Sequence, residues 1–107
     1  MSEPSDQTPS QPPESPDEVE ALRQELAGAD PAVVVANHCY GLFELAAVYL
    51  SEVPPRLAAA QLAIDALAAL VETLGDRLGD AATPLGEALA QLRLAWVQLN
   101  AVTSSEN

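Results

Sequence analysis

The chain contains no lysine, one cysteine, one histidine and few aromatic side chains. Its 107 residues hold four basic side chains, all of them arginine, against 16 acidic ones, which gives a formal net charge of −12. Proteins that bind nucleic acids neutralise phosphates with Lys and Arg, so this charge balance argues against a nucleic-acid partner. Docking on an anionic membrane surface is disfavoured for the same reason.

The scarcity of metal ligands and nucleophiles limits the chemistry of the chain. Cys39 has no second cysteine with which to form an intramolecular disulfide, and one Cys with one His is too few for a zinc site. No GxSxG, HExxH, GxxxxGK or paired-cysteine motif occurs. We therefore expect no cofactor, no metal and no catalytic residues. The first ten residues, MSEPSDQTPS, lack the basic and apolar segments of a secretory signal, so we expect a cytoplasmic protein.

Hydrophobic residues make up 49% of the chain, although aromatic residues make up only 4%. Ala, Leu and Val supply this apolar content, which favours closely packed helices over a sheet. Residues 1–15 are rich in Pro and acidic side chains and are predicted to be a disordered tail. Such a tail either binds a basic protein partner or keeps the chain soluble.

A short helix is predicted over residues 16–28. Ser15 and Glu18 fit a capping box, Pro16 occupies the first helical position, and Gly28 suits the end of the helix. Its apolar stripe of Val19, Leu22 and Leu26 is narrow, so this helix either docks on the rest of the chain or stays partly formed.

Residues 30–102 are predicted to be a helical domain of three antiparallel helices. Asp30 and Pro31 begin the first helix, which runs to about Ser51. The segment VPP at 53–55 separates it from a second helix, from about Pro55 to Leu78, because proline interrupts the helical hydrogen bonds. The segment GDAATP precedes a third helix that reaches about Val102, with Thr83 as its N-cap, and residues 103–107 are expected to be disordered. Short connections force neighbouring helices to be antiparallel.

Apolar residues recur at alternating spacings of three and four in the second and third helices. In the second helix this seam comprises Leu57, Ala60, Ile64, Leu67, Val71, Leu74 and Leu78. A further apolar edge lies beside it, formed by Leu62, Ala66, Ala69 and Leu70. Because a helix with two apolar edges needs two neighbours, we predict self-association, as a dimer.

The stretch VVVANHCYGLFELAAVYL, residues 33–50, is nearly all apolar, and it allows three interpretations. A membrane span is disfavoured because Glu44 would lie near the bilayer centre, where a carboxylate is costly. A catalytic pair of His38 and Cys39 is disfavoured because adjacent helical side chains point about 100° apart.

The third interpretation makes this stretch one wall of a helical core. Cys39 is then a small buried hydrophobe and Gly41 permits a close helix crossing. The predicted inward seam comprises Val35, Leu42 and Tyr49, joined by His38 and Leu45.

The segments around Pro54 and Pro55, around Ile64, Asp65 and Leu67, and around Leu92, Arg93, Trp96 and Val97 resemble a small bacterial family. This is the domain-of-unknown-function family numbered eighteen forty-four, and the resemblance covers roughly residues 35–99. The lysine-free, alanine-rich composition is similar to that of actinobacterial members. The chain departs from the family in the segment LGDRLGDAATP. The resemblance implies a helical fold and adds no activity.

The sequence predicts a protein–protein interaction or accessory regulatory module without catalytic activity. The alternative is a small ligand-binding protein or enzyme with its site in a dimer cleft near His38, together with Tyr40 and Glu44. Asp65 and Arg93 are charges inside apolar helices, and they either pair between the helices or face solvent separately. Trp96 completes the set of candidate interface residues.

Overall fold

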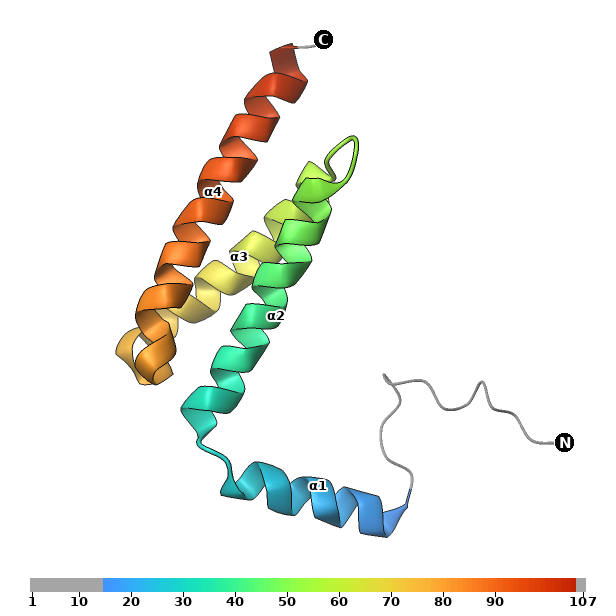
Figure 1. The fold of residues 1–107 in the computed structure, drawn as a ribbon, viewed down its shortest axis with the longest axis vertical. Coiled ribbons are helices and arrows are strands. Elements are labelled where there is room, and N and C mark those ends of the chain that lie inside the picture. Colours follow the sequence, from blue (N-terminus) through green and yellow to red (C-terminus); the bar gives the residue numbers. More distant parts are fainter. Residues whose placement is uncertain (1–14, 106–107) are drawn as a thin grey trace, which may run out of the picture.

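The structure is a computed structural model that describes residues 15–105, and within this range it contains helices and no strand (Figure 1). The all-α prediction is confirmed. Apart from Ser15, the predicted acidic tail lies outside the described residues, and so do residues 106 and 107. The elements in chain order are α1 (Pro16–Gly28), α2 (Pro31–Ser51), α3 (Leu57–Leu74), the 3-10 helix η2 (Gly75–Ala81) and α4 (Ala82–Ser105).

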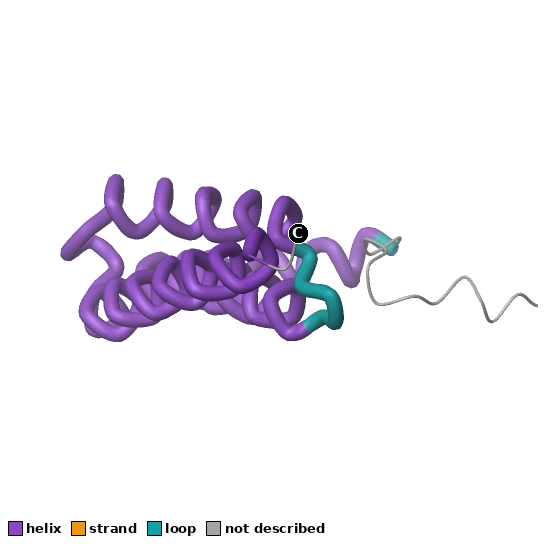
Figure 2. The backbone as a smooth tube through the Cα atoms, turned by 90° about the horizontal axis from the view of Figure 1, so that it is seen from above, coloured by secondary structure: helices purple, strands orange, loops and turns teal. Residues whose placement is uncertain are grey.

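Helices α2, α3 and α4 pack together in two layers. Figure 1 shows α3 crossing behind α2 and α4, and Figure 2 shows the two layers from above. The shortest dimension of the molecule is 15 Å between Cα atoms, which suits two layers whose axes lie about 8–10 Å apart. Successive helices reverse direction, as the short connections predict. The contact between α2 and α3 is the most extensive, and η2 packs against all three helices.

Local capping signals set the first two helices where the sequence predicts them. The Ser15 hydroxyl accepts a hydrogen bond from the Glu18 amide at 3.1 Å, and the Glu18 carboxylate accepts one from the Ser15 amide at 3.5 Å. The Asp30 carboxylate accepts a hydrogen bond from the Ala32 amide at 2.9 Å. Each bond satisfies an amide that has no partner within its helix.

The break between the last two helices differs from the prediction. Helix α3 ends at Leu74 rather than Leu78, because Gly75 and Gly79 adopt φ angles of 51° and 67°. Residues with a Cβ atom rarely accept these angles, so the two glycines permit the 3-10 segment between them. Helix α4 begins at Ala82, which places Thr83 inside its first turn rather than at its N-cap.

Two other helix ends also differ from the prediction. Helix α3 starts at Leu57 rather than at Pro55. Helix α4 continues to Ser105, so residues 103–105 are helical rather than disordered.

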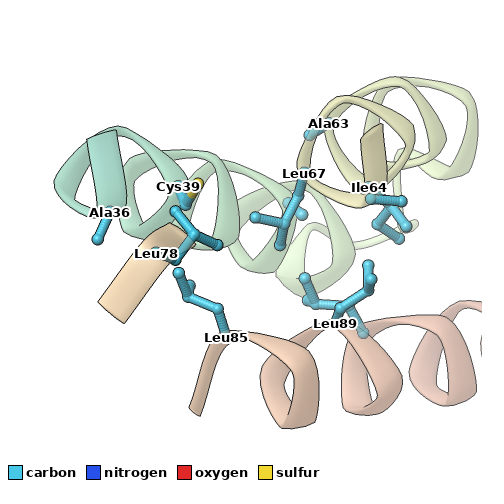
Figure 3. Close-up of a cluster of buried hydrophobic side chains, with 11 residues drawn as sticks. Ala36, Cys39, Ala63, Ile64, Leu67, Leu78, Leu85 and Leu89 are labelled. Atoms are coloured by element: carbon cyan, nitrogen blue, oxygen red, sulfur yellow. The ribbon is translucent and has the colours of Figure 1, made fainter. Parts of the chain in front are cut away.

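The core is built from small and medium-sized side chains. Figure 3 shows Leu67 pointing between the packed helices, and Leu78 lying between Cys39 and Leu85. The buried cluster comprises Ala36, Cys39, Ala46, Ala63, Ile64, Leu67, Ala68, Leu78, Leu85, Leu89 and Leu92. Three residues of the predicted seam of the second helix, Ile64, Leu67 and Leu78, belong to this cluster, together with Leu85, Leu89 and Leu92 of α4.

The predicted inward face of α2 is partly wrong. His38 and Leu45 are exposed, whereas Ala36, Cys39 and Ala46 are the buried residues of this helix. Val35 and Leu42 are half-buried at the edge of the core. Relative to the prediction, α2 is turned about its axis so that its smallest side chains face the core, because these let the neighbouring helices approach most closely.

The role predicted for Gly41 is also wrong. Gly41 is exposed, and a Cβ atom built on it would meet nothing within 4 Å. It does not mark a helix crossing.

Candidate interaction surfaces

Helix α1 is formed but packs against no other described element. None of its residues is buried, and Figure 1 shows it extending away from α2, α3 and α4. Val19, Leu22 and Leu26 lie on one stripe of the helix and are 49%, 42% and 52% exposed. A 13-residue helix is marginal in water without tertiary packing. No other element of the described residues covers this apolar stripe.

The rest of the α1 surface is acidic. Its acids are Asp17, Glu18, Glu20 and Glu25, and its one base is Arg23. The Arg23 guanidinium contacts the Glu20 carboxylate at 2.6 Å between Nη2 and Oε2. This hydrogen bond lowers the pKa of Glu20 and raises the pKa of Arg23. Both side chains are exposed, so the pair contributes little to stability, and its effect is to neutralise the only base of the helix.

A cleft of about 460 Å³ lies where the start of α2 meets η2. Tyr40 and Asn37 line it from α2, and Asp80 lines it from η2. Asp30 adds a second carboxylate at the mouth of the cleft. Tyr40 is the one predicted candidate residue in this cleft.

A smaller groove of about 330 Å³ runs between α3 and α4. It is lined by Gln61, Ile64, Arg93, Trp96 and Val97. The Trp96 indole Nε1–H donates a hydrogen bond to the Leu57 carbonyl oxygen at 2.9 Å, which ties α4 to the first turn of α3. The groove thus has a mostly apolar floor and one basic rim residue, Arg93.

Of the two alternatives for Asp65 and Arg93, the pair between the helices does not form, and both side chains are exposed. Arg93 contacts Glu72 instead, at 3.1 Å between Nη2 and Oε2, and Asp65 accepts a hydrogen bond from Gln61 at 2.7 Å. Asp65 and Glu72 are seven residues apart and share one face of α3. Helical side chains lean toward the N-terminus of their helix, and in antiparallel packing this directs Arg93 toward the C-terminal end of α3, where Glu72 lies. All three charges are exposed.

His38 and Glu44 line neither the cleft nor the groove, and both are exposed. The groove therefore brings Arg93 and Trp96 together, whereas neither the cleft nor the groove unites His38, Tyr40 and Glu44. Glu72 is the partner of Arg93 that the sequence interpretation missed. Its spacing of seven from Asp65 was the available signal.

Cys39 is fully buried, and burial raises the pKa of its thiol. We expect thiol reagents at about pH 8 to label it at least about 100-fold more slowly than a free cysteine, because reaction requires opening of the core. The raised pKa also makes stability pH-dependent. Burial of the protonated thiol contributes fully to the free energy of unfolding below the pKa of the thiol in the unfolded chain, about 8.5. This contribution is lost as the pH rises through the higher pKa of the thiol in the folded protein.

Urea unfolding between neutral and alkaline pH measures this effect. Cys39→Ala is the control, because it removes the titrating thiol while other alkaline effects remain. Equal alkaline loss of stability in both proteins, or rapid labelling of the native chain, would contradict the burial of this side chain.

Two helical stretches, Pro31–Ser51 and Leu57–Ser105, are long and apolar enough to cross a membrane by length and composition alone. Core helices of soluble proteins meet the same criteria, so the observation is weak evidence for a membrane protein. Only 17% of the first apolar window and 28% of the second are buried. Much of the apolar surface of these helices is thus uncovered in a single copy.

Comparisons of the chain with protein-family models, with curated proteins and with solved structures found no match. The resemblance to the family numbered eighteen forty-four therefore stays a prediction.

Proposed function

We propose that the chain is a protein–protein interaction module, an adaptor or accessory regulator without catalytic activity, that works in the cytoplasm. The observation that carries the proposal is α1, a helix with an N-terminal capping box whose apolar stripe contacts no other described element. A soluble protein that keeps such a helix free gains no stability from it. The helix gains its stability when a partner covers the stripe, since the order of a short helix comes mainly from tertiary packing.

The charges of α1 define the chemistry of the partner. Glu18 and Glu25 are seven residues apart and border one side of the Val19, Leu22 and Leu26 stripe. A matching surface has an apolar groove for the stripe and Lys or Arg along the adjoining rim. A second copy of this lysine-free chain fits poorly as that partner. We therefore infer that α1 binds a different protein, one with an apolar groove and a basic rim.

A native pull-down of the tagged full chain tests the proposal, run beside the double variant Leu22→Asp with Leu26→Asp. We expect the full chain to retain a stoichiometric partner, and the double variant to retain at least about 10-fold less of it. The reason is that two leucines that the partner covers become charged. Leu62→Asp is the matched control, since Leu62 is 74% exposed on α3 and lies outside α1. The retained protein is then purified and titrated against the same three chains.

A variant lacking residues 1–14 separates the contribution of the acidic tail from that of α1. Loss of the partner from this variant alone assigns recognition to the tail. Recovery of the same proteins at the same levels with the wild type and the α1 double variant would contradict a role for α1. Recovery of no stoichiometric partner by the wild type would contradict the adaptor function itself.

A further inference from the structure

Helix α4 has a second apolar face, opposite the face that enters the core. Leu85, Leu89 and Leu92 point inward and are buried. The outer face carries four apolar residues, here called the α4 outer stripe, and all are exposed: Ala90, Leu94, Val97 and Ala101. Leu94 and Val97 at its centre are 58% and 57% exposed. Spacings of four, three and four place these residues on one side of the helix.

The α4 outer stripe is also the least charged part of an acidic molecule. The chain as a whole carries a net charge of −12. Helix α4 holds one acid, Glu87, and one base, Arg93, so its formal net charge is zero. Helix α2 carries Glu44 and α3 carries Asp65 and Glu72, with no Lys or Arg in either helix, so two copies that meet through α4 face the smallest net repulsion.

The order of the residues along the stripe makes it self-complementary. The spacings of four, three and four are the same in both directions, with their centre between Leu94 and Val97. An antiparallel pair of such helices sets Ala90 opposite Ala101 of the other copy, and Leu94 opposite its Val97. Bulky residues then meet at the centre and small ones at both ends. In an antiparallel twofold pair each side of the stripe meets the same side of the other copy. Gln91 and Gln98 lie on one side, and Arg93 and Asn100 lie on the other, so Arg93 lies near Asn100 of the other copy.

We propose that α4 pairs with α4 of a second copy through this stripe, in an antiparallel arrangement with twofold symmetry. Twofold dimers are the commonest oligomers, and in them each contact between two different residues occurs twice. The inference does not rest on the function assigned to α1, because it uses a different surface.

The groove between α3 and α4 extends this interface beyond a single helix. Val97 belongs to the α4 outer stripe and also lines the groove, next to Trp96 and Ile64. Specific interfaces bury about 800 Å² on each partner, which one helix stripe does not supply. The apolar floor of the groove lies beside the stripe and adds to the area that the second copy covers.

A matched pair of variants tests where the copies meet. Val97→Glu places two unpaired carboxylates in the interface, and we expect sedimentation equilibrium to show dimerisation weakened at least about 100-fold. Val48→Glu is the control, because Val48 on α2 is 55% exposed, close to the value of Val97. We expect this control to change the dimerisation constant by less than about 3-fold.

The two variants also separate this interface from general apolar association. Equal weakening by both would show that exposed hydrophobes associate without a specific surface, and would overturn the proposal. Circular dichroism checks that each variant stays helical. If Val97→Glu loses its helicity, Leu94→Glu provides the same test, since Leu94 does not line the groove.

Mixing single variants tests the antiparallel arrangement. Leu94→Glu and Val97→Lys each place unpaired charges in their own homodimer, so we expect both to be monomeric alone. When they are mixed, the carboxylate introduced at position 94 of one copy faces the ammonium group introduced at position 97 of the other, and we expect a heterodimer. In the mixture of Leu94→Glu with Leu94→Lys, an antiparallel pair sets each introduced charge opposite Val97 of the other copy, whereas a parallel pair sets the two charges opposite each other. A heterodimer in the second mixture and none in the first would overturn the antiparallel geometry, and a heterodimer in neither mixture would overturn the interface.

Discussion

Replacing Leu67 with alanine is expected to lower the free energy of unfolding by about 2–5 kcal/mol. Leu67 is fully buried between the packed helices, in a cluster where half of the other buried members are alanine or cysteine (Figure 3). Small neighbours hold few atoms that can move into the space that a removed isobutyl group leaves. The lost contacts are therefore replaced by a cavity rather than by repacking.

The expected loss is large for a protein of this size, because small domains have a total stability of about 5–15 kcal/mol. Urea denaturation followed by circular dichroism measures it. Leu62→Ala is the matched control, since it removes the same atoms from the same helix at a site that is 74% exposed. We expect the control to change stability by less than about 0.5 kcal/mol. Similar losses for the two variants would mean that Leu67 does not lie at the centre of the core.

Replacing Gly79 with alanine is expected to cost about 1–3 kcal/mol. Gly79 has φ 67° and ψ −138°, a backbone conformation that residues with a side chain rarely adopt. A Cβ atom at this position would lie 3.7 Å from the Ala32 Cβ atom, which is an ordinary contact. The expected cost is therefore one of backbone strain in the turn before α4, and not a steric clash.

Gly41→Ala is the control for this substitution and is expected to have the opposite sign. Gly41 lies inside α2, where a Cβ atom would meet nothing within 4 Å. Alanine there should stabilise the protein by about 0.5–1 kcal/mol, because it restricts the unfolded chain and favours the helix. Thermal or urea unfolding of both variants measures the difference. Stabilisation by Gly79→Ala would contradict the positive φ angle in the break between α3 and α4.

Signals that act over a few residues predicted the structure well. The capping box at Ser15 and the Asp30–Pro31 pair fix the starts of α1 and α2, because each side chain bonds an amide only two or three residues away. The inward side of α3 was also predictable, because Gln61, Asp65 and Glu72 mark a polar stripe on it. Helix α4 is apolar on two sides, so its spacing alone does not select the side that turns inward.

The inward face of α2 was not predictable in the same way. This helix is apolar on nearly every side, so its periodicity does not select one face, and the contacts with α3 select the face with Ala36, Cys39 and Ala46. The end of α3 was misplaced because Leu78 continues the apolar spacing after Leu74. Leu78 is indeed buried, but it belongs to η2 and not to α3.

Some features of the interaction surfaces were predictable from the sequence, and others depend on how the helices pack. The composition and the second apolar edge of α3 predicted uncovered surface, and Leu62 is 74% exposed. Which acid meets Arg93 depends on how α3 and α4 lie along one another, a relation between distant segments that neither helix encodes alone. That α1 makes no contact with the other helices is likewise a property of the folded arrangement.

The mass of the unmodified chain in solution tests the central claim, that apolar helix surface left open in one copy is covered by a second. Sedimentation equilibrium across micromolar concentrations gives this mass directly. The account predicts a reversible equilibrium that reaches twice the mass of one chain. The mass of a single chain at every concentration, from a protein that remains folded, would contradict it.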